Sequence, residues 1–295
     1  MDDFLTAALR YVPNLVAGNL VSGRSKVVAA ITPSIQNSNF AGMIMGLEHE
    51  LDAQGYHLII SVVEAADHEY EAARALIGRR VDGIVLTGVD RDAPTRRLLK
   101  HSRIPIVETW NLDGPFIDMG VGFSARNSAR DATQLMIDNG LRRIGVAGYV
   151  TSGNRRFQER LSGFSDAMTA SGLADDLVAS VPSWSGFAGG RAALEQLLEQ
   201  EPDLEGIFCF TDVLAAGVVF ECIRRGWVVP DRLAVVGSGD YEIAAELPPG
   251  LTTIHLPDDR IGREAARLII ARCTGAPIES NVVDVGYSIV RRRSV

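Results

Sequence analysis

The order of apolar and amphipathic segments constrains the fold of this chain more than any other feature. From Lys26 onward, short runs rich in β-branched residues alternate with longer segments whose apolar residues recur at helical spacing. Short strand–helix–strand spacing of this kind predicts a parallel sheet with helices on both faces. The first series predicts strands at Val27–Ile31, His57–Val63, Gly83–Thr87 and Ile104–Glu108, and helices at Phe40–Gln54, His68–Arg79 and Thr95–His101.

A second series of the same kind follows the first. It predicts strands at Arg143–Ala147, Leu177–Val181, Gly206–Cys209, Ala234–Gly237 and Val282–Val290, and helices at Ser128–Asn139, Asn154–Ser171, Ala188–Gln200, Asp212–Arg225 and Asp259–Thr274. Two series predict an α/β fold of two doubly wound subdomains that face a ligand cleft. Open parallel sheets bind ligands beyond the carboxyl ends of their strands, so a second sheet at those ends would close over the ligand by hinge motion.

Composition limits the classes of partner and compartment. The chain of 295 residues has a formal net charge of −8, which argues against a large nucleic-acid surface on its body. Its cysteines, Cys209, Cys222 and Cys273, are odd in number and lie in apolar runs, which predicts reduced, packed thiols in a cytoplasmic protein. We find no export signal and no apolar run long enough to span a bilayer, so we expect no membrane partner.

The motifs that enzymes use are not found in the sequence. Its five histidines are scattered without metal-ligand spacing. Ser162-Gly163 lacks the Gly-x-Ser-x-Gly elbow of hydrolases, and the glycine-rich run at Gly186–Gly190 has no P-loop lysine. The sequence therefore predicts a protein that is not an enzyme and that uses no cofactor or metal.

An ordered set of short motifs gives the chain a family resemblance. The set consists of Tyr11–Ser25 directly before the first strand, then Pro33–Phe40, Val81–Ile84, Arg160–Phe164, Phe208–Gly217 and Leu251–Ile254. In this order they resemble the family of the lac repressor and the gluconate operon repressor, which are sugar-sensing transcription regulators. The segments Ile117–Phe123 and Gly206–Cys209 are most similar to the gluconate repressor branch.

The resemblance implies a division of the chain and a set of partners. Residues 1–25 would be a remnant of a DNA-binding head with its hinge helix. Residues 26–123 and 256–274 would form the first effector-binding subdomain, and residues 124–255 and 275–295 the second. The implied partners are a sugar or sugar-acid effector, a second copy of the chain in a homodimer, and operator DNA bound only through a more complete head.

The hinge helix carries the DNA contacts that the resemblance implies. These fall on Asn14, Ala17 and Leu20. Leu20 lies where family members insert a leucine into the minor groove, which kinks the duplex. An apolar contact of Leu20 with the partner's hinge helix or with the core is the alternative interpretation.

The resemblance also places ligand-binding residues at the ends of strands in both subdomains. They are Ser34, Asn37, Phe40, Glu64, Thr87, Glu108 and Trp110 in the first, and Arg126, Arg160, Trp184, Asp212 and Gly239 in the second. Three of them have plainer interpretations. Arg160 would otherwise be a surface cation, Asp212 a helix N-cap, and Trp184 a loop-packing residue.

Two departures from the sugar-binding members favour a charged effector. Ser124-Ala125-Arg126 stands where many members have an Asp-Asn pair, and Ser238-Gly239 stands where many have an acidic residue. Fewer carboxylates and an added cation favour an anionic ligand, and an arginine fork pairs well with a carboxylate. We therefore expect the chain to belong to a repressor whose effector is a sugar acid such as gluconate. A solute-binding protein for sugar uptake is the alternative.

Overall fold

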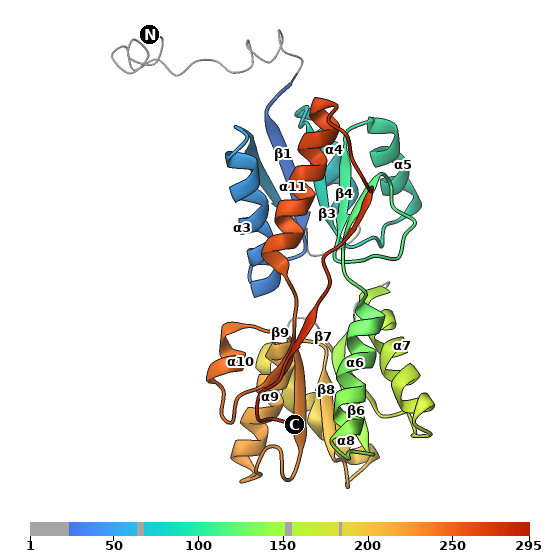
Figure 1. The fold of residues 1–295 in the computed structure, drawn as a ribbon, viewed down its shortest axis with the longest axis vertical. Helices are drawn as coiled ribbons and strands as arrows, with labels where there is room; N and C mark the ends of the chain where they lie inside the picture. The colour runs from blue at the N-terminus through green and yellow to red at the C-terminus, as the bar shows by residue number, and fades with distance from the viewer. Residues whose placement is uncertain (1–23, 64–67, 151–154, 183–184) are drawn as a thin grey trace, which may run out of the picture.

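Two six-stranded sheets, each covered by helices on both faces, lie end to end in the chain (Figure 1). The computed structural model describes residues 24–63, 68–150, 155–182 and 185–295. We call the two halves the first and the second subdomain. The two doubly wound subdomains expected from the sequence are thus confirmed.

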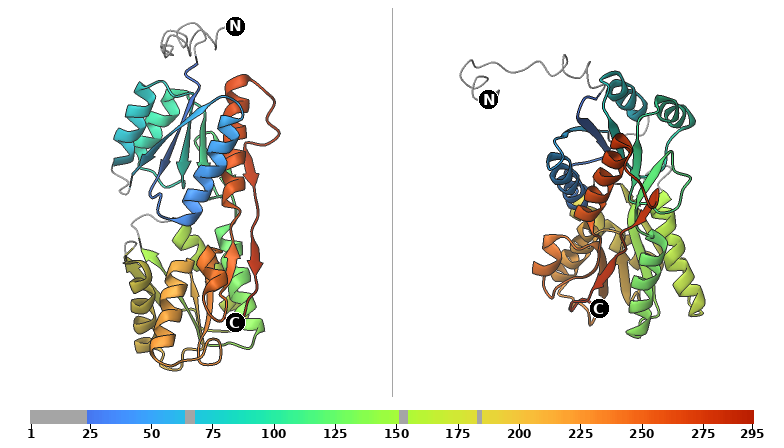
Figure 2. Two further views of the ribbon diagram at one scale, coloured as in Figure 1. Left: turned by 90° about the vertical axis from the view of Figure 1, so that its left-hand side faces the viewer. Right: turned by 45° about the horizontal axis from the view of Figure 1, so that its top comes forward.

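The first subdomain is built on a sheet whose strands are all parallel. Its order is β11-β5-β4-β3-β1-β2. The strands are β1 (Val27–Thr32), β2 (His57–Val62), β3 (Gly83–Thr87), β4 (Ile106–Thr109), β5 (Met119–Gly122) and β11 (Val282–Asp284). Helices α3 (Ser38–Asp52) and α11 (Asp258–Thr274) cover one face, and α4 (Glu69–Gly78) and α5 (Ala93–Ser102) cover the other (Figure 2). The interior strand β1 is apolar from Val27 to Ile31, as expected for a strand that is buried on both faces.

The second subdomain repeats this design with one antiparallel edge strand. Its order is β12-β10-β9-β8-β6-β7, and only β12 is antiparallel to its neighbour. The strands are β6 (Ile144–Val150), β7 (Val178–Pro182), β8 (Gly206–Cys209), β9 (Ala234–Gly239), β10 (Thr252–His255) and β12 (Ser288–Val290). The helices are α6 (Ala125–Asp138), α7 (Arg155–Ala170), α8 (Gly186–Gln200), α9 (Asp212–Arg224) and the short α10 (Glu242–Glu246).

One boundary from the sequence is wrong. The single strand predicted at Val282–Val290 is two strands in different sheets, because β11 pairs with β5 and β12 pairs with β10. The start of the segment 275–295 therefore belongs to the first subdomain, and the chain crosses to the second only between β11 and β12. An apolar run shows that a strand forms but does not show which sheet edge it joins.

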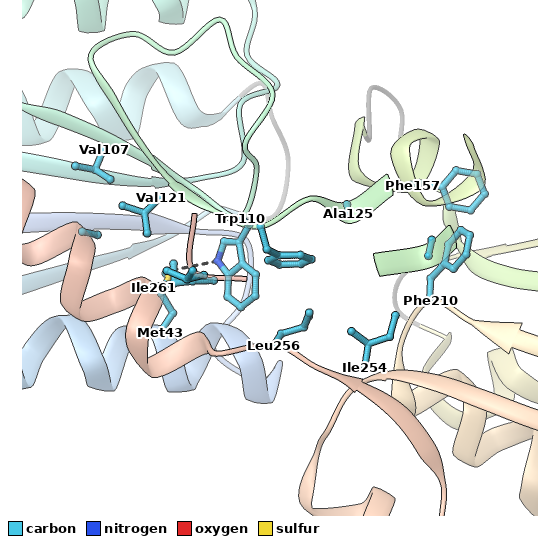
Figure 3. Close-up of a cluster of buried hydrophobic side chains, with 14 of the residues drawn as sticks. Met43, Val107, Trp110, Val121, Ala125, Phe157, Phe210, Ile254, Leu256 and Ile261 are labelled. Carbon is cyan, nitrogen blue, oxygen red and sulfur yellow. Dashed lines mark hydrogen bonds between the residues drawn. The ribbon is translucent and has the colours of Figure 1, made fainter. Parts of the chain in front are cut away.

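The two subdomains share part of their hydrophobic core where the chain crosses between them. Trp110 and Val121 of the first subdomain belong to the same buried cluster as Phe157 and Phe210 of the second. Leu256, on the crossover from β10 to α11, lies between these two groups (Figure 3). Apolar burial, the main favourable contribution to folding, therefore continues from one subdomain into the other.

Helices α3 and α11 approach each other closely enough that only glycine fits at the contact. A Cβ atom on Gly262 would lie 2.0 Å from the carbonyl oxygen of Met43, and one on Gly46 would lie 2.1 Å from that of Asp259. Both neighbours are backbone atoms, which cannot move aside as a side-chain end can. The two helices are therefore held as one unit (Figure 2).

The start of β1 is tied to the rest of the first subdomain by Asp82. Its Oδ1 accepts hydrogen bonds from the amide (2.8 Å) and the hydroxyl (3.0 Å) of Ser25, and its Oδ2 accepts one from the amide of Lys26 (2.9 Å). The guanidinium of Arg24 donates to the carbonyl of Cys273, at the end of α11. The path of the chain into β1 is thus fixed from two elements. Among the described residues, we find no helix long and apolar enough to cross a bilayer.

Replacing Gly262 by alanine tests the helix contact. We expect Gly262→Ala to lower the free energy of unfolding by about 1–3 kcal/mol, because the added methyl group overpacks a backbone contact. Equilibrium urea denaturation measures the change. Gly78→Ala is the matched control: an added Cβ there meets nothing within 4 Å, so the higher helix propensity of alanine leaves stability unchanged or raises it by about 0.5–1 kcal/mol. Equal stability of the two variants would contradict the contact.

Candidate ligand site

The ends of strands from both sheets meet at the junction between the subdomains. In the first subdomain, Asn37 and Phe40 follow β1, and Asp90 follows β3. In the second, the first turns of α7 follow β6, and Tyr241 follows β9. Hydrogen bonds and a cation–ring contact join these groups across the junction. Open parallel sheets bind ligands beyond the carboxyl ends of their strands, and in this structure the two subdomains contact each other there.

Asn37 and Tyr241 form a direct hydrogen bond across the junction. The Oδ1 atom of Asn37 caps helix α3 by accepting from the amides of Asn39 and Phe40. The same oxygen accepts the hydroxyl of Tyr241 at 3.0 Å. Burial raises the pKa of Tyr241, so its hydroxyl stays protonated and donates. The cap of a first-subdomain helix is therefore also a contact of the second subdomain.

A second polar contact crosses the junction nearby. The backbone amide of Arg155 donates to Oδ2 of Asp90 at 2.8 Å. The side chain of Arg155 pairs with Glu159 at 3.2 Å, and the other oxygen of Glu159 accepts from Asn111, also at 3.2 Å. These contacts hold the start of α7 against the loops that follow β3 and β4.

Asp212 is fully buried and holds Tyr241 in place. Its Oδ2 accepts from the amide of Tyr241 at 2.8 Å, and its Oδ1 accepts from the hydroxyl of Thr253 at 2.6 Å. Burial raises its pKa to about 6, although both hydrogen bonds act in the opposite direction. The N-cap of α9 is Thr211, whose hydroxyl accepts from the amide of Val213, so the capping interpretation of Asp212 is wrong by one residue.

Arg160 and Arg156 bring two cations to the junction. Among the described residues, the Nε atom of Arg160 is buried without a hydrogen-bond partner. Burial, and then the charge of Arg156, lowers the pKa of Arg160 to about 10, so it remains protonated at neutral pH. The guanidinium of Arg156 lies 5.6 Å from the ring centre of Phe40 in the first subdomain, within the range of a cation–π interaction.

Phe40 also has an aromatic contact within its own subdomain, with Trp110. Trp110 is only 3% exposed, and its indole N–H donates to the sulfur of Met43 at 3.1 Å (Figure 3). Its ring meets the ring of Phe40 edge-on, with 5.4 Å between the ring centres. Trp110 also packs edge-on against Phe123. Of the predicted aromatic residues that the structure describes, Phe40 is the more accessible, and Trp110 packs against its ring.

Glu108 and Thr87, two predicted ligand-binding residues of the first subdomain, differ in whether protein groups already bind their polar atoms. Glu108 is fully buried, pairs with Arg91 at 2.6 Å and accepts from the amide of Ile117 at 2.5 Å. Burial raises its pKa despite the charge of Arg91. The hydroxyl of Thr87, at the end of β3, is buried with no partner among the described residues. Thr87 thus offers an unused polar group, whereas Glu108 is committed to Arg91.

The remaining predicted residues lie in different surroundings. Ser34 accepts from the amide of Gln36, and Gly239 has a φ of 135° and packs against the ring of Tyr241. The structure does not bring Arg126 to the junction: its exposed guanidinium forms two hydrogen bonds with Asp166, later along α7. That carboxylate on the neighbouring helix neutralises the predicted cation. The predictions for Glu64, Trp184, Asn14, Ala17 and Leu20 lie outside the described residues.

The sequence did not single out Arg156, Tyr241 or Asp90. For Arg156 a signal was present, because it lies four residues before Arg160 and so shares its helix face. Tyr241 and Asp90 stand in short loops without a periodic pattern, and only their contacts identify them. In the part of the chain that the structure describes, no group of three histidine, cysteine, aspartate or glutamate side chains is placed to hold a metal ion. The junction therefore offers cations and hydrogen-bonding groups.

The raised pKa of Asp212 predicts a pH dependence of stability. In the folded state its pKa is about 6, above the usual 3.8, so folding takes up a proton between those two pH values. Its ionised form opposes folding above that pH, and this cost is relieved as the pH falls. Relative to Asp212→Asn, we expect the wild-type free energy of unfolding to rise by about 1 kcal/mol from pH 7 to pH 5. Urea denaturation at both pH values measures this, and a difference that does not change with pH would contradict the assignment.

Comparison with known proteins places the fold and the junction in context. Residues 133–295 match the family model of the periplasmic binding protein-like domain. The HTH-type transcriptional regulator GntR of Escherichia coli strain K12 is 30% identical over 286 residues, which are 95% of this chain and 84% of that protein. The regulator IdnR of the same strain is also 30% identical, over 283 residues. Both relatives are transcriptional regulators.

A solved structure agrees with these relatives. The transcription regulator GntR from Chromobacterium violaceum superposes with a TM-score of 0.86 at 32% identity, and covers 91% of this chain and 98% of that one.

Proposed function

The chain belongs to the LacI family of transcriptional regulators, and on this premise we propose that it is the effector-binding and dimerisation core of a sugar-responsive repressor whose effector is a sugar acid such as gluconate. DNA contact would involve the segment that contains Asn14, Ala17 and Leu20, as part of a complete DNA-binding head. The match to regulators over 95% of the chain favours this function over solute uptake.

The unpaired guanidinium of Arg160 is the observation that carries the choice of a sugar acid. It is held at the junction without an ion-pair partner among the described residues, and its Nε has no acceptor. A buried donor without an acceptor costs stability, and a carboxylate that binds it relieves that cost. The fork of an arginine pairs with both oxygens of a carboxylate. A neutral sugar offers only weaker acceptors to this group.

Further residues at the junction suit the rest of such a ligand. The hydroxyl of Thr87 has no hydrogen-bond partner among the described residues and can bind a ligand hydroxyl. Phe40 provides an apolar surface for the CH groups of a sugar chain. The proposed ligand contacts at the described positions are Ser34, Asn37, Phe40, Thr87, Glu108, Trp110, Arg160, Asp212 and Gly239. Asp212 and Glu108 have their carboxylates engaged by protein groups, so we expect them to act mainly by positioning neighbours.

The exposed edge of the first sheet supports the proposal of a homodimer. β2 is the last strand of that sheet. Its Ile59, Ile60 and Val62 are between 39% and 47% exposed. An exposed apolar edge strand is a surface that proteins normally cover. We propose that a second copy of the chain covers it.

Titration calorimetry with gluconate and glucose tests the effector class. We expect gluconate to bind more tightly, because only gluconate carries a carboxylate for Arg160. Arg160→Gln should weaken gluconate by about 2 kcal/mol, or roughly thirtyfold, through loss of charge-assisted hydrogen bonds, with little change for glucose. Arg126→Gln removes the same charge from a surface ion pair and should leave both affinities unchanged. Tighter binding of glucose by the wild type would refute a sugar-acid effector.

Sedimentation velocity tests the dimer. We expect the wild type to sediment as a dimer at micromolar concentration, and Ile60→Lys to weaken dimerisation by about tenfold or more, because a charge buried in an apolar interface loses its hydration. Gln54→Lys adds the same charge to an exposed turn next to β2 and should remain dimeric. A monomeric wild type, or an Ile60→Lys variant that dimerises as well as the wild type, would refute this surface.

A further inference from the structure

Two arginines on one face of α7 indicate more negative charge in the ligand than a single carboxylate supplies; this step rests on the effector site proposed above. Arg156 and Arg160 are one helical turn apart, so their side chains leave the same face. Like charges at this spacing repel each other. Burial lowers the pKa of both groups, which means that each charge is partly withdrawn from water.

The carboxylates around the pair are engaged elsewhere. Glu159 pairs with Arg155 and accepts from Asn111, and Asp90 accepts the backbone amide of Arg155. The carboxylates of Glu69 and Glu108 both pair with Arg91. Among the described residues, no carboxylate oxygen lies within ion-pair distance of Arg156 or Arg160.

The two guanidiniums differ in what they contact. Arg160 has a buried Nε without an acceptor, so a donor in the junction is unused. Arg156 reaches across to the first subdomain, where it lies over Phe40. One carboxylate satisfies one guanidinium fork with its two oxygens, which leaves the second arginine without an anionic partner.

We propose that the effector is a sugar acid with two anionic groups, a carboxylate and either a second carboxylate or a phosphate, and that Arg160 binds one group and Arg156 the other. Arg156 is then a specificity-determining residue. It selects the doubly charged acid over the singly charged one, and its contact with Phe40 places the second group next to the first subdomain.

Calorimetric titration of the full chain with four probes tests this assignment. The probes are glucose without charge, gluconate with one carboxylate, glucarate with two, and 6-phosphogluconate with a carboxylate and a phosphate. We expect at least one of the doubly charged acids to bind about tenfold more tightly than gluconate, a difference of about 1.4 kcal/mol. The tighter of the two identifies the second group as a carboxylate or as a phosphate.

Substitutions at Arg156 separate selectivity from packing. Arg156→Gln should reduce the preference for the doubly charged acid to less than about threefold and leave gluconate binding within about threefold, since Arg160 remains. Arg156→Lys keeps the charge and should retain most of the preference. Arg130→Gln removes a charge from an exposed pair with Asp131 and should retain all of it. Thermal unfolding of each variant checks that it is folded.

Several outcomes would overturn the assignment. They are equal binding of gluconate and both doubly charged acids by the wild type, failure of both doubly charged acids to bind, and equal loss of all acids in Arg156→Gln. Preference for gluconate over glucose without preference for a second charge would refute this inference and leave the sugar-acid proposal standing. Tightest binding of glucose would refute both.

Discussion

The relative position of the two subdomains depends on three crossings of the chain and on the apolar core that surrounds them. The crossings run from β5 to α6, from β10 to α11 and from β11 to β12. Trp110 and Leu256 pack beside them in a cluster that continues to Phe157 and Phe210. Three covalent links at one junction keep the carboxyl ends of the strands in the two sheets facing each other. A relative motion of the subdomains would therefore be a hinge rotation about the crossings.

The buried acidic and basic side chains at the junction differ in whether their polar atoms have hydrogen-bond partners. Asp212 and Glu108 are fully buried, yet each accepts two hydrogen bonds from protein groups. Arg160 is left with an unused donor. An unpaired buried charge is costly, whereas a satisfied one is tolerated. Asp212 and Glu108 have their oxygens engaged by protein groups, whereas Arg160 keeps a buried donor without an acceptor among the described residues. This asymmetry is the physical basis for expecting an anion.

The sequence predicted the architecture better than the site. Strands and helices follow from local periodicity, so the two doubly wound subdomains were predictable. The split of Val282–Val290 was not, because partner choice at a sheet edge is non-local. Arg160 and Arg126 looked equivalent as cations near strand ends, but Asp166 on the neighbouring helix neutralises only Arg126. Tyr241 lies at the site because its backbone amide donates to the carboxylate of Asp212. These two residues are far apart in the sequence, so no spacing pattern predicts the contact.

The anchoring of residues 24–26 has a mechanical consequence. Helix α11 begins directly after the crossing from β10 and ends beside Cys273, whose carbonyl holds Arg24. Its 17 residues make a rigid lever about 25 Å long, and the glycine contact with α3 prevents it from sliding. A tilt of about 5° at the crossing would move its far end by about 2 Å. Because Cys273 holds Arg24 and Asp82 holds Ser25 and Lys26, the start of β1 would be displaced with that end.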